Sequence, residues 1–208
     1  MSRRVLLATR SRHKAAEIQR LVKPASSIEL ITLQNLGIQE SSAEDDLENE
    51  PTFVGNARAK ALFFAHLTGV ETLGDDSGLE VIALNLAPGV RTRRFALDAG
   101  QCELTGAALD AANLELTLQR MQSFPAGQRA ARYVCACALA SPGGELVTSV
   151  GTCSGEIAFE RRGTGGFGYD PIFLIPGLGR TFAELTPDQK DDLSHRARAC
   201  RALLSLIR

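Results

Sequence analysis

Gly74-Asp75-Asp76-Ser77-Gly78, followed by the apolar stretch 79–84, is the part of the sequence around which the rest can be arranged. The apolar stretch predicts a strand over residues 79–84, so the two carboxylates would lie at a loop-to-strand junction. A rigid scaffold can hold adjacent carboxylates at such a junction for Mg2+, a cation that prefers oxygen ligands. Because Asp, Ser and Gly are also the commonest turn residues, a solvated acidic turn is the alternative interpretation.

The length and charge of the chain limit what it can do. Its 208 residues suffice for one sizeable α/β domain, or for two small lobes that share a cleft. The formal net charge of -1 provides no basic field, which disfavours binding to a nucleic-acid polymer. The five cysteines lack CxxC spacing, which predicts reduced core thiols rather than a disulfide framework or a zinc site.

The sequence shows no export or membrane signal. The apolar run at residues 5–8 is too short to be the core of a signal peptide. No apolar run approaches the roughly 20 residues that span a bilayer. We therefore expect a cytoplasmic protein without a membrane partner.

The first predicted strand and helix would create an anion-binding loop. Residues 5–8 predict a buried strand, and residues 15–22 have helical spacing. Ser11 can cap this helix, and Lys14 adds a mobile positive charge near its start. Backbone N–H groups and the positive end of the helix would then converge on one point, which suits an oligophosphate. A plain capped helix with a solvated basic first turn is the alternative.

An acidic segment precedes the next helix. Carboxylates crowd residues 39–50 without apolar periodicity, which indicates a solvated loop, although one of them could reach a metal. Thr52 is the predicted N-cap of a helix over residues 53–65, and Gly55 removes the acid or amide that would complete a capping box. Helix geometry favours a Lys60 side chain that snorkels beside the core, and a side chain that points into a cleft is the alternative.

The remaining segments predict a mixed sheet. The expected strands are 27–33, 132–140, 145–150 and its continuation 151–159, and the expected helix is 104–124, ended by Pro125. A strand, tight turn and strand indicate an antiparallel pair beside the early parallel unit. The arginines among residues 87–95 predict either a surface for an anionic ligand or solvated charges.

The segment 161–173 combines glycines with two aromatic residues. Glycines let the backbone come close to a ligand, while Phe167 and Tyr169 offer ring faces on which a base could stack. A flexible linker is the alternative, but linkers rarely carry aromatic residues. This composition favours a clamp for a sugar and base.

A capping box at Thr186 and Pro187 predicts the start of a C-terminal helix. Lys190, His195 and Arg196 lie off its apolar stripe. Such residues usually form a solvated face. The alternative is a set of donors gathered near the glycine-rich segment.

Six of these stretches, in this order, resemble the Ham1/ITPA family of non-canonical purine nucleoside triphosphate pyrophosphatases. They are Ala8-Thr9 with Lys14; Thr52-Phe53, Asn56-Ala57 and Lys60-Ala61; Asp75-Asp76-Ser77-Gly78-Leu79; Pro88-Gly89-Val90 with Arg94-Phe95; residues 163–173; and Lys190 with Ser194-His195-Arg196. The resemblance implies an α/β fold, an elongated mixed β-sheet flanked by helices, with two lobes and a central cleft. Residues 1–208 would form a single domain of this type, usually as a homodimer. The implied reaction is Mg2+-dependent hydrolysis of dITP, ITP and XTP to the monophosphate and pyrophosphate, which cleanses the nucleotide pool.

The resemblance also assigns roles to individual residues. Asp76 would be the catalytic general base and a metal ligand, and Glu48 the second ligand of Mg2+. The triphosphate would be held by Thr9, Arg10, Ser11, Arg12, His13, Lys14 and Lys60. The other contacts with the small-molecule nucleotide would come from Ser77, Phe167, Gly168, Tyr169, Asp170, Lys190, His195 and Arg196. A 6-oxo purine would accept hydrogen bonds from donors such as His195, whereas the amino group of adenine would present another donor.

Three departures from the family pattern keep other functions open. Arg10-Ser11 stands where the family usually has Gly/Arg-Asn, and Gly55 stands where it has Glu. Glu50 replaces the Gly that commonly precedes Thr52-Phe53, which affects the alignment of Glu48. The alternatives are a nucleotide-binding protein without turnover and a pyrophosphatase for other modified nucleotides.

Overall fold

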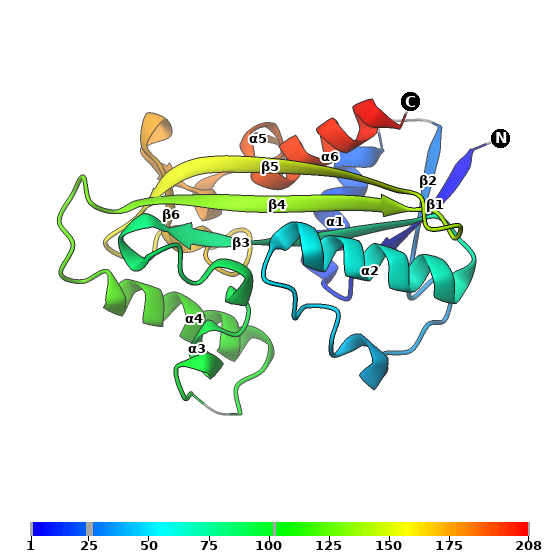
Figure 1. The fold of residues 1–208 in the computed structure, drawn as a ribbon. Helices are drawn as coiled ribbons and strands as arrows, with labels where there is room; N and C mark the ends of the chain where they lie inside the picture. Colours follow the sequence, from blue (N-terminus) through cyan, green and yellow to red (C-terminus); the bar gives the residue numbers. More distant parts are fainter. Residues whose placement is uncertain (1, 24–26, 102, 208) are drawn as a thin grey trace. The chain divides into compact units, whose positions relative to one another are not determined.

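The computed structural model describes residues 2–23, 27–101 and 103–207. Its sheet has seven strands in the order β2-β1-β3-β4-β5-β6-β7 (Figure 1). The strands are β1 (Arg3–Ala8), β2 (Ile28–Thr32), β3 (Thr72–Val81), β4 (Ala130–Ala140), β5 (Leu146–Ile157), β6 (Phe173–Ile175) and β7 (Arg180–Thr181). The α-helices are α1 (Arg12–Val22), α2 (Phe53–Thr68), α3 (Phe95–Asp98), α4 (Gly106–Arg120), α5 (Pro187–Leu193) and α6 (His195–Leu206). Strand β1 is parallel to β2 and β3, whereas β6 is antiparallel to β5 and β7, so the predicted mixed sheet is confirmed.

The chain divides into two compact units. The first contains Met1–Ser77, Cys135–Gly151 and His195–Arg208, and the second contains Gly78–Val134 and Thr152–Ser194. No helix in the described part of the chain is long and apolar enough to cross a membrane. The cysteines at 135, 137, 153 and 200 are buried and free, as expected of core thiols, and Cys102 lies outside the described residues.

In the first unit, helices cover both faces of the strands. Alternate residues of β1 point to opposite faces: Val5 and Leu7 pack with α1 and α6, while Leu6 packs with Phe64 of α2 (Figure 1). A Cβ at Gly74 would lie 2.5 Å from the carbonyl oxygen of Ala57. Glycine at this position therefore lets α2 pack directly on β3.

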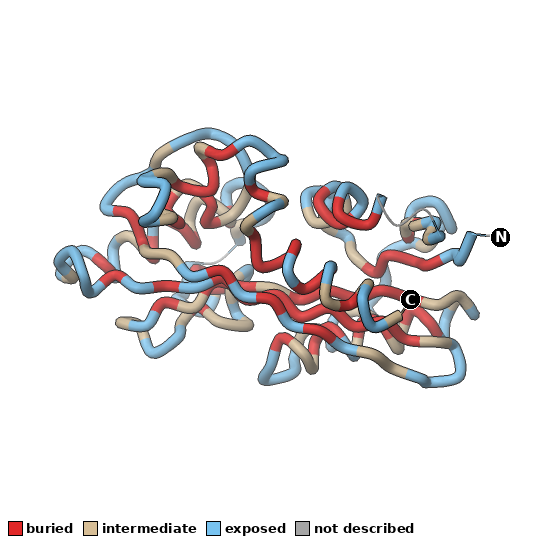
Figure 2. The backbone as a smooth tube through the Cα atoms, turned by 90° about the horizontal axis from the view of Figure 1, so that it is seen from above, coloured by how far each residue is buried: buried red, intermediate tan, exposed pale blue. Residues whose placement is uncertain are grey.

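The second unit has its own apolar core. The ring centroid of Phe173 lies 4.5 Å from that of Tyr133 and 4.9 Å from that of Phe182. Arg129 is also buried, and its guanidinium donates to the carbonyl oxygens of Met121, Phe124, Ile157 and Ala158. Figure 2 shows how the buried segments follow the strands and one side of the helices.

Some predicted boundaries were wrong. Strand β3 begins at Thr72 and ends at Val81, so the two carboxylates lie within a strand, and residues 82–84 form a 3-10 turn. Pairing of β3 with β1 overrides the turn-like composition of the acidic stretch. Helix α4 ends at Arg120 rather than at Phe124. The guanidinium of Arg129 donates to the carbonyl oxygens of Met121 and Phe124, which follow the helix. The C-terminal helix is interrupted at Ser194, which caps the end of α5.

Candidate functional site

The two adjacent carboxylates of β3 serve different neighbours because successive side chains of a strand point to opposite faces. Asp75 shares the face of Leu73, which packs with α1 and α6, and forms an ion pair with Lys14 of α1. Asp76 shares the face of Gly74, against which α2 lies, and is bound by side chains of α2. Each carboxylate is buried, which excludes the solvated acidic turn.

Helix α2 holds both carboxylate oxygens of Asp76. Asn56 Nδ2 donates to Asp76 Oδ2 at 2.9 Å, and Lys60 Nζ lies 3.4 Å from Asp76 Oδ1. The two helical residues are four positions apart and therefore lie on one face. Lys60 Nζ also lies 3.0 Å from Glu48 Oε1, so the ammonium joins the two predicted metal ligands.

Lys60 does not snorkel to the surface, and this local expectation was wrong. Its side chain is buried, with 8% of the residue exposed. Burial opposes the charged form, but the carboxylates of Asp76 and Glu48 outweigh it and raise the pKa of Lys60 above its ordinary value. The side chain is thus a permanent cation at neutral pH.

The donors around Lys60 suit a small hard cation. Glu48 and Asp76 already converge on one positive centre, the Lys60 ammonium. The described residues contain no group of three or more His, Cys, Asp or Glu side chains that could hold a metal by themselves. Mg2+ commonly binds through one or two carboxylates, with ligand oxygens and water completing its shell. The pair therefore fits Mg2+ bound together with an oxyanion ligand.

Asp75 belongs to a second ionic cluster. Its Oδ2 lies 3.2 Å from Lys14 Nζ and 3.7 Å from Arg196 Nε. Burial alone would raise the pKa of Asp75, but the charges of Lys14 and Arg196 hold it below its ordinary value. Arg196 further forms an ion pair with Glu17 and donates to Ser77 Oγ at 2.8 Å. These ion pairs and the hydrogen bond thus connect α1, β3 and α6.

A solvated face at Lys190, His195 and Arg196 is excluded, because all three residues are buried. Arg196 is 2% exposed, and its guanidinium is engaged by Glu17 and Ser77. This geometry suits a residue that positions Ser77 and Asp75. Lys190 forms an ion pair with Asp170 of the glycine-rich segment. This contact agrees with the alternative that donors gather near that segment.

The loop between β1 and α1 has the predicted cap. Ser11 Oγ accepts from the backbone N–H of Lys14 at 3.3 Å, while Thr9 Oγ1 accepts from the N–H of Ser11 at 3.2 Å. Arg10 is turned toward the acidic segment, where it forms an ion pair with Glu44 at 2.6 Å. Arg12 and His13 are exposed in the first turn of the helix. Arg10 therefore anchors a neighbouring loop in addition to any role with phosphate.

The glycine-rich segment is organised by one buried carboxylate. Asp170 Oδ2 accepts from the N–H of Phe167 at 2.9 Å and lies 2.5 Å from Lys190 Nζ, while Tyr133 donates to Oδ1 at 3.2 Å. A Cβ at Gly166, where φ is +69°, would lie 2.0 Å from the same Oδ2. These contacts exclude a flexible linker.

The two aromatic rings of the segment have different surroundings. Tyr169 is buried, and its hydroxyl donates to the carbonyl oxygen of Thr92 at 2.7 Å. Burial raises the pKa of Tyr169. Phe167 is only half-buried, and Lys190 Nζ lies 4.9 Å from its ring centroid. The ring of Phe167 is therefore partly open, whereas the expectation of an open ring face at Tyr169 was wrong.

Three residues of these clusters were given no role from the sequence. Asn56 binds Asp76, Glu17 binds Arg196, and Tyr133 binds Asp170. The spacing of Asn56 and Lys60 is the one local signal that pointed to a shared helix face. Glu17 and Tyr133 act through contacts distant in sequence, which no local pattern reveals.

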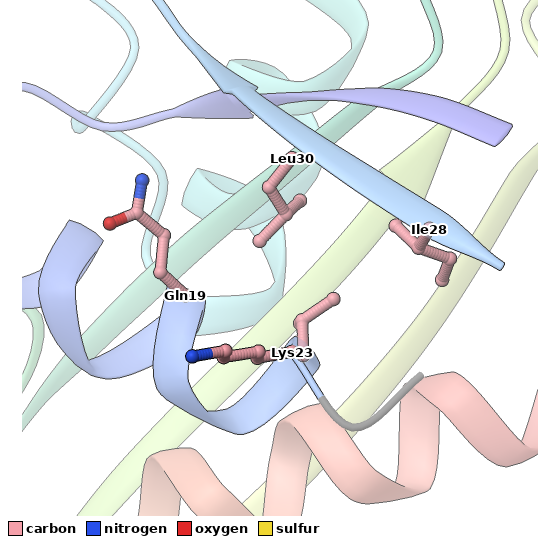
Figure 3. Close-up of a pocket in the computed structure, with 5 residues that line it drawn as sticks. Gln19, Lys23, Ile28 and Leu30 are labelled. Carbon is pink, nitrogen blue, oxygen red and sulfur yellow. The ribbon is translucent and has the colours of Figure 1, made fainter. Parts of the chain in front are cut away.

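A pocket of about 420 Å³ lies elsewhere in the first unit, between α1 and β2 (Figure 3). It is lined by Gln19, Val22, Lys23, Ile28 and Leu30. This lining contains one charged side chain and no carboxylate. The pocket therefore lacks the chemistry of the two clusters around β3.

Known proteins resemble this chain over nearly its full length. The Ham1 family profile matches residues 5–206. A dITP/XTP pyrophosphatase from Exiguobacterium sibiricum is 42% identical over 201 residues, which cover 96% of this chain and 94% of the relative. One from Mycolicibacterium paratuberculosis is 42% identical over 206 residues, covering 98% and 95%. The structure of a HAM1 protein from Coxiella burnetii has a TM-score of 0.82 at 35% identity, covering 99% of this chain and 98% of that one. Sequence and fold agree, and the chain belongs to the Ham1 family.

Proposed function

We propose that the protein hydrolyses non-canonical purine nucleoside triphosphates, namely dITP, ITP and XTP, to the monophosphate and pyrophosphate. The observation that carries this proposal is the contact of the buried Lys60 with buried Asp76 and with the partly exposed Glu48, in a chain whose relatives are named dITP/XTP pyrophosphatases. A paired acidic and cationic arrangement is what phosphoryl transfer needs, because its catalysis consists mainly of positioning and charge stabilisation.

Each charged residue can be given a role in this hydrolysis. Asp76 would accept a proton from the water whose oxygen attacks the α-phosphorus, as the bond to the bridging oxygen breaks and pyrophosphate leaves. Lys14 and Lys60 would bind phosphate oxygens, together with the capped start of α1. Glu48 and Asp76 would hold Mg2+, which supplies positive charge to the phosphates when it is bound.

The glycine-rich segment would supply a ring face to the base. Phe167 offers a partly exposed ring, and Asp170 with Lys190 keeps that part of the segment in place. His195 is the candidate donor to a 6-oxo group. Ser77, which accepts from Arg196, would contact the nucleotide through its hydroxyl. A base that presents an amino group at this position would face a donor and bind less well.

The test is a substrate panel of dITP, XTP, ATP and GTP, each with and without Mg2+, read as released pyrophosphate. Release from dITP and XTP with Mg2+, and much less from ATP, is expected. Asp76→Asn should abolish turnover and leave the fold intact. Absence of pyrophosphate from both dITP and XTP would overturn the proposal.

Two departures that favour binding without turnover have structural explanations. Ser11 caps α1, and Gly55 makes room for Glu50. Tight ITP binding without hydrolysis would nevertheless identify a nucleotide-binding protein. Pyrophosphate release from dUTP or dTTP rather than dITP would identify a pyrophosphatase for other nucleotides.

We also infer that the protein acts as a cytoplasmic homodimer, because the resemblance implies a dimer and free nucleotides are the substrate. Light scattering on the protein as it elutes from a size-exclusion column would measure the mass of the particle in solution. A mass of one chain would contradict the dimer.

A further inference from the structure

Asn56 links Asp76, to which a metal role is assigned, to the end of the segment that carries Glu48. It has no exposed surface, and its side chain uses both ends of the amide. Nδ2 donates to Asp76 Oδ2 at 2.9 Å, while Oδ1 accepts from the backbone N–H of Glu50 at 2.9 Å. Glu50 lies two residues after Glu48. One amide therefore fixes the Asp76 carboxylate and the end of the segment that carries Glu48.

The two side chains that bind Asp76, those of Lys60 and Asn56, interact with it differently. Lys60 is a cation that also binds Glu48, so phosphate oxygens and the Glu48 carboxylate can compete for it. The Asn56 amide is neutral and directional, and its other end is held by the backbone of Glu50. Its contact with Asp76 can therefore persist when Lys60 changes partner.

We propose that Asn56 is a positioning residue that sets the orientation of the Asp76 carboxylate and couples it to the Glu48 segment. The Asn56 amide donates to Asp76 Oδ2. Asp76 Oδ1 therefore faces Lys60, which also contacts Glu48. Asn56 contacts no reacting atom. Its effect on turnover rests on the proposed function, whereas its effect on the protein without metal does not.

The sharpest test exchanges donor and acceptor. Asn56→Asp keeps the size of the side chain and an acceptor for the Glu50 N–H, but faces Asp76 with a second acceptor. Asp76→Asn leaves one acceptor oxygen for two donors, so its new NH2 group must face either Asn56 Nδ2 or Lys60 Nζ. The double variant N56D/D76N restores one donor and one acceptor with their positions reversed, so the two changes should not be additive.

Urea unfolding is measured on all four proteins in EDTA, so that neither metal nor substrate contributes. We expect each single variant to be less stable and the double variant to recover at least half of the summed loss. The matched control is Asn49→Asp, because Asn49 lies in the same segment, is exposed, and donates to Asp46. Additive losses in the double variant, or an equal loss in the control, would overturn the inference. If Asn56→Asp alone does not fold, cooperative unfolding of the double variant counts as the rescue and its absence as the refutation.

Turnover of dITP gives the second readout. Asn56→Asp should lower kcat at least tenfold and change KM less than threefold, because Lys14 and the capped helix still bind phosphate. A variant with wild-type kcat at saturating Mg2+ would refute the positioning role. Inactivity of the wild-type protein toward dITP and XTP would refute the proposed function alone, since the unfolding measurements need no substrate.

Discussion

Glu50 occupies the space that a side chain at Gly55 would need. A Cβ built on Gly55 would lie 2.7 Å from Glu50 Cβ and 3.1 Å from Glu50 Cγ. The Glu50 Cβ is fixed by the backbone and cannot rotate away, and the Glu50 N–H is bound by Asn56. The two departures from the family pattern at positions 50 and 55 are thus one coupled change in packing.

This relationship reverses the usual effect of a helix substitution. Gly→Ala in a helix ordinarily gains about 1 kcal/mol. In this chain we expect Gly55→Ala to lower the free energy of unfolding, because the new methyl group meets Glu50. In the Glu50→Gly background the same change should stabilise the protein by about 1 kcal/mol. Urea unfolding of the four proteins measures the coupling, and equal effects of Gly55→Ala in both backgrounds would contradict it.

Local signals predicted much of the first unit. The apolar run of β1 and the caps Ser11 and Thr52 depend on neighbours within a few residues, and each was confirmed. The boundaries of β3 were wrong because its acidic, glycine-rich composition resembles a turn. Pairing with β1 and the close packing of α2 on Gly74 decide that segment, and neither is visible in the local sequence.

The site was predictable only through resemblance. Composition favoured a solvated Lys190 and Arg196, yet both are buried beside carboxylates from other parts of the chain. The resemblance predicted a nucleotide contact at Asp170, but gave no sign of its partner Tyr133, which precedes it by 37 positions. Pairing partners of buried charges are set by tertiary structure, so periodicity carries no information about them.

Glu48→Gln tests the metal role of the acidic segment. Removing one of the two carboxylates around Lys60 should raise the Mg2+ concentration needed for half-maximal turnover of dITP by about tenfold. Titration of activity with Mg2+ measures this change. Asp45→Asn is the matched control, because Asp45 is an exposed carboxylate of the same segment and should leave the Mg2+ requirement unchanged. If both variants respond equally, general charge rather than Glu48 accounts for the effect.

Gly166→Ala should disrupt the contact that orders the glycine-rich segment. The new methyl group would meet Asp170 Oδ2, and the positive φ adds strain of about 1 kcal/mol. Because Asp170 holds the N–H of Phe167, we expect a raised KM for dITP with a smaller change in kcat. Gly179→Ala is the control, since Gly179 has a similar φ of +61° but open space around it. A KM that rises equally in both variants would show that backbone strain alone is responsible.

Tyr169→Phe should change how stability depends on alkaline pH. Burial raises the pKa of Tyr169 in the folded state, whereas an unfolded tyrosine ionises near pH 10. The contribution of the neutral Tyr169 hydroxyl to the free energy of unfolding is therefore fully present below about pH 10. It is lost as pH rises through the raised folded pKa, at about 1.4 kcal/mol per pH unit. The variant loses the hydrogen bond to Thr92 and should be about 1 kcal/mol less stable at neutral pH.

The alkaline loss from this residue is absent in Tyr169→Phe, so the unfolding free energies of the two proteins should converge above about pH 10. Urea unfolding at a series of pH values measures both curves. Other groups that titrate in this range affect the two proteins alike, and the difference between the curves isolates Tyr169. Curves that stay parallel from neutral to alkaline pH would show that the hydroxyl ionises as easily in the folded chain as in the unfolded one, which its burial against Thr92 opposes.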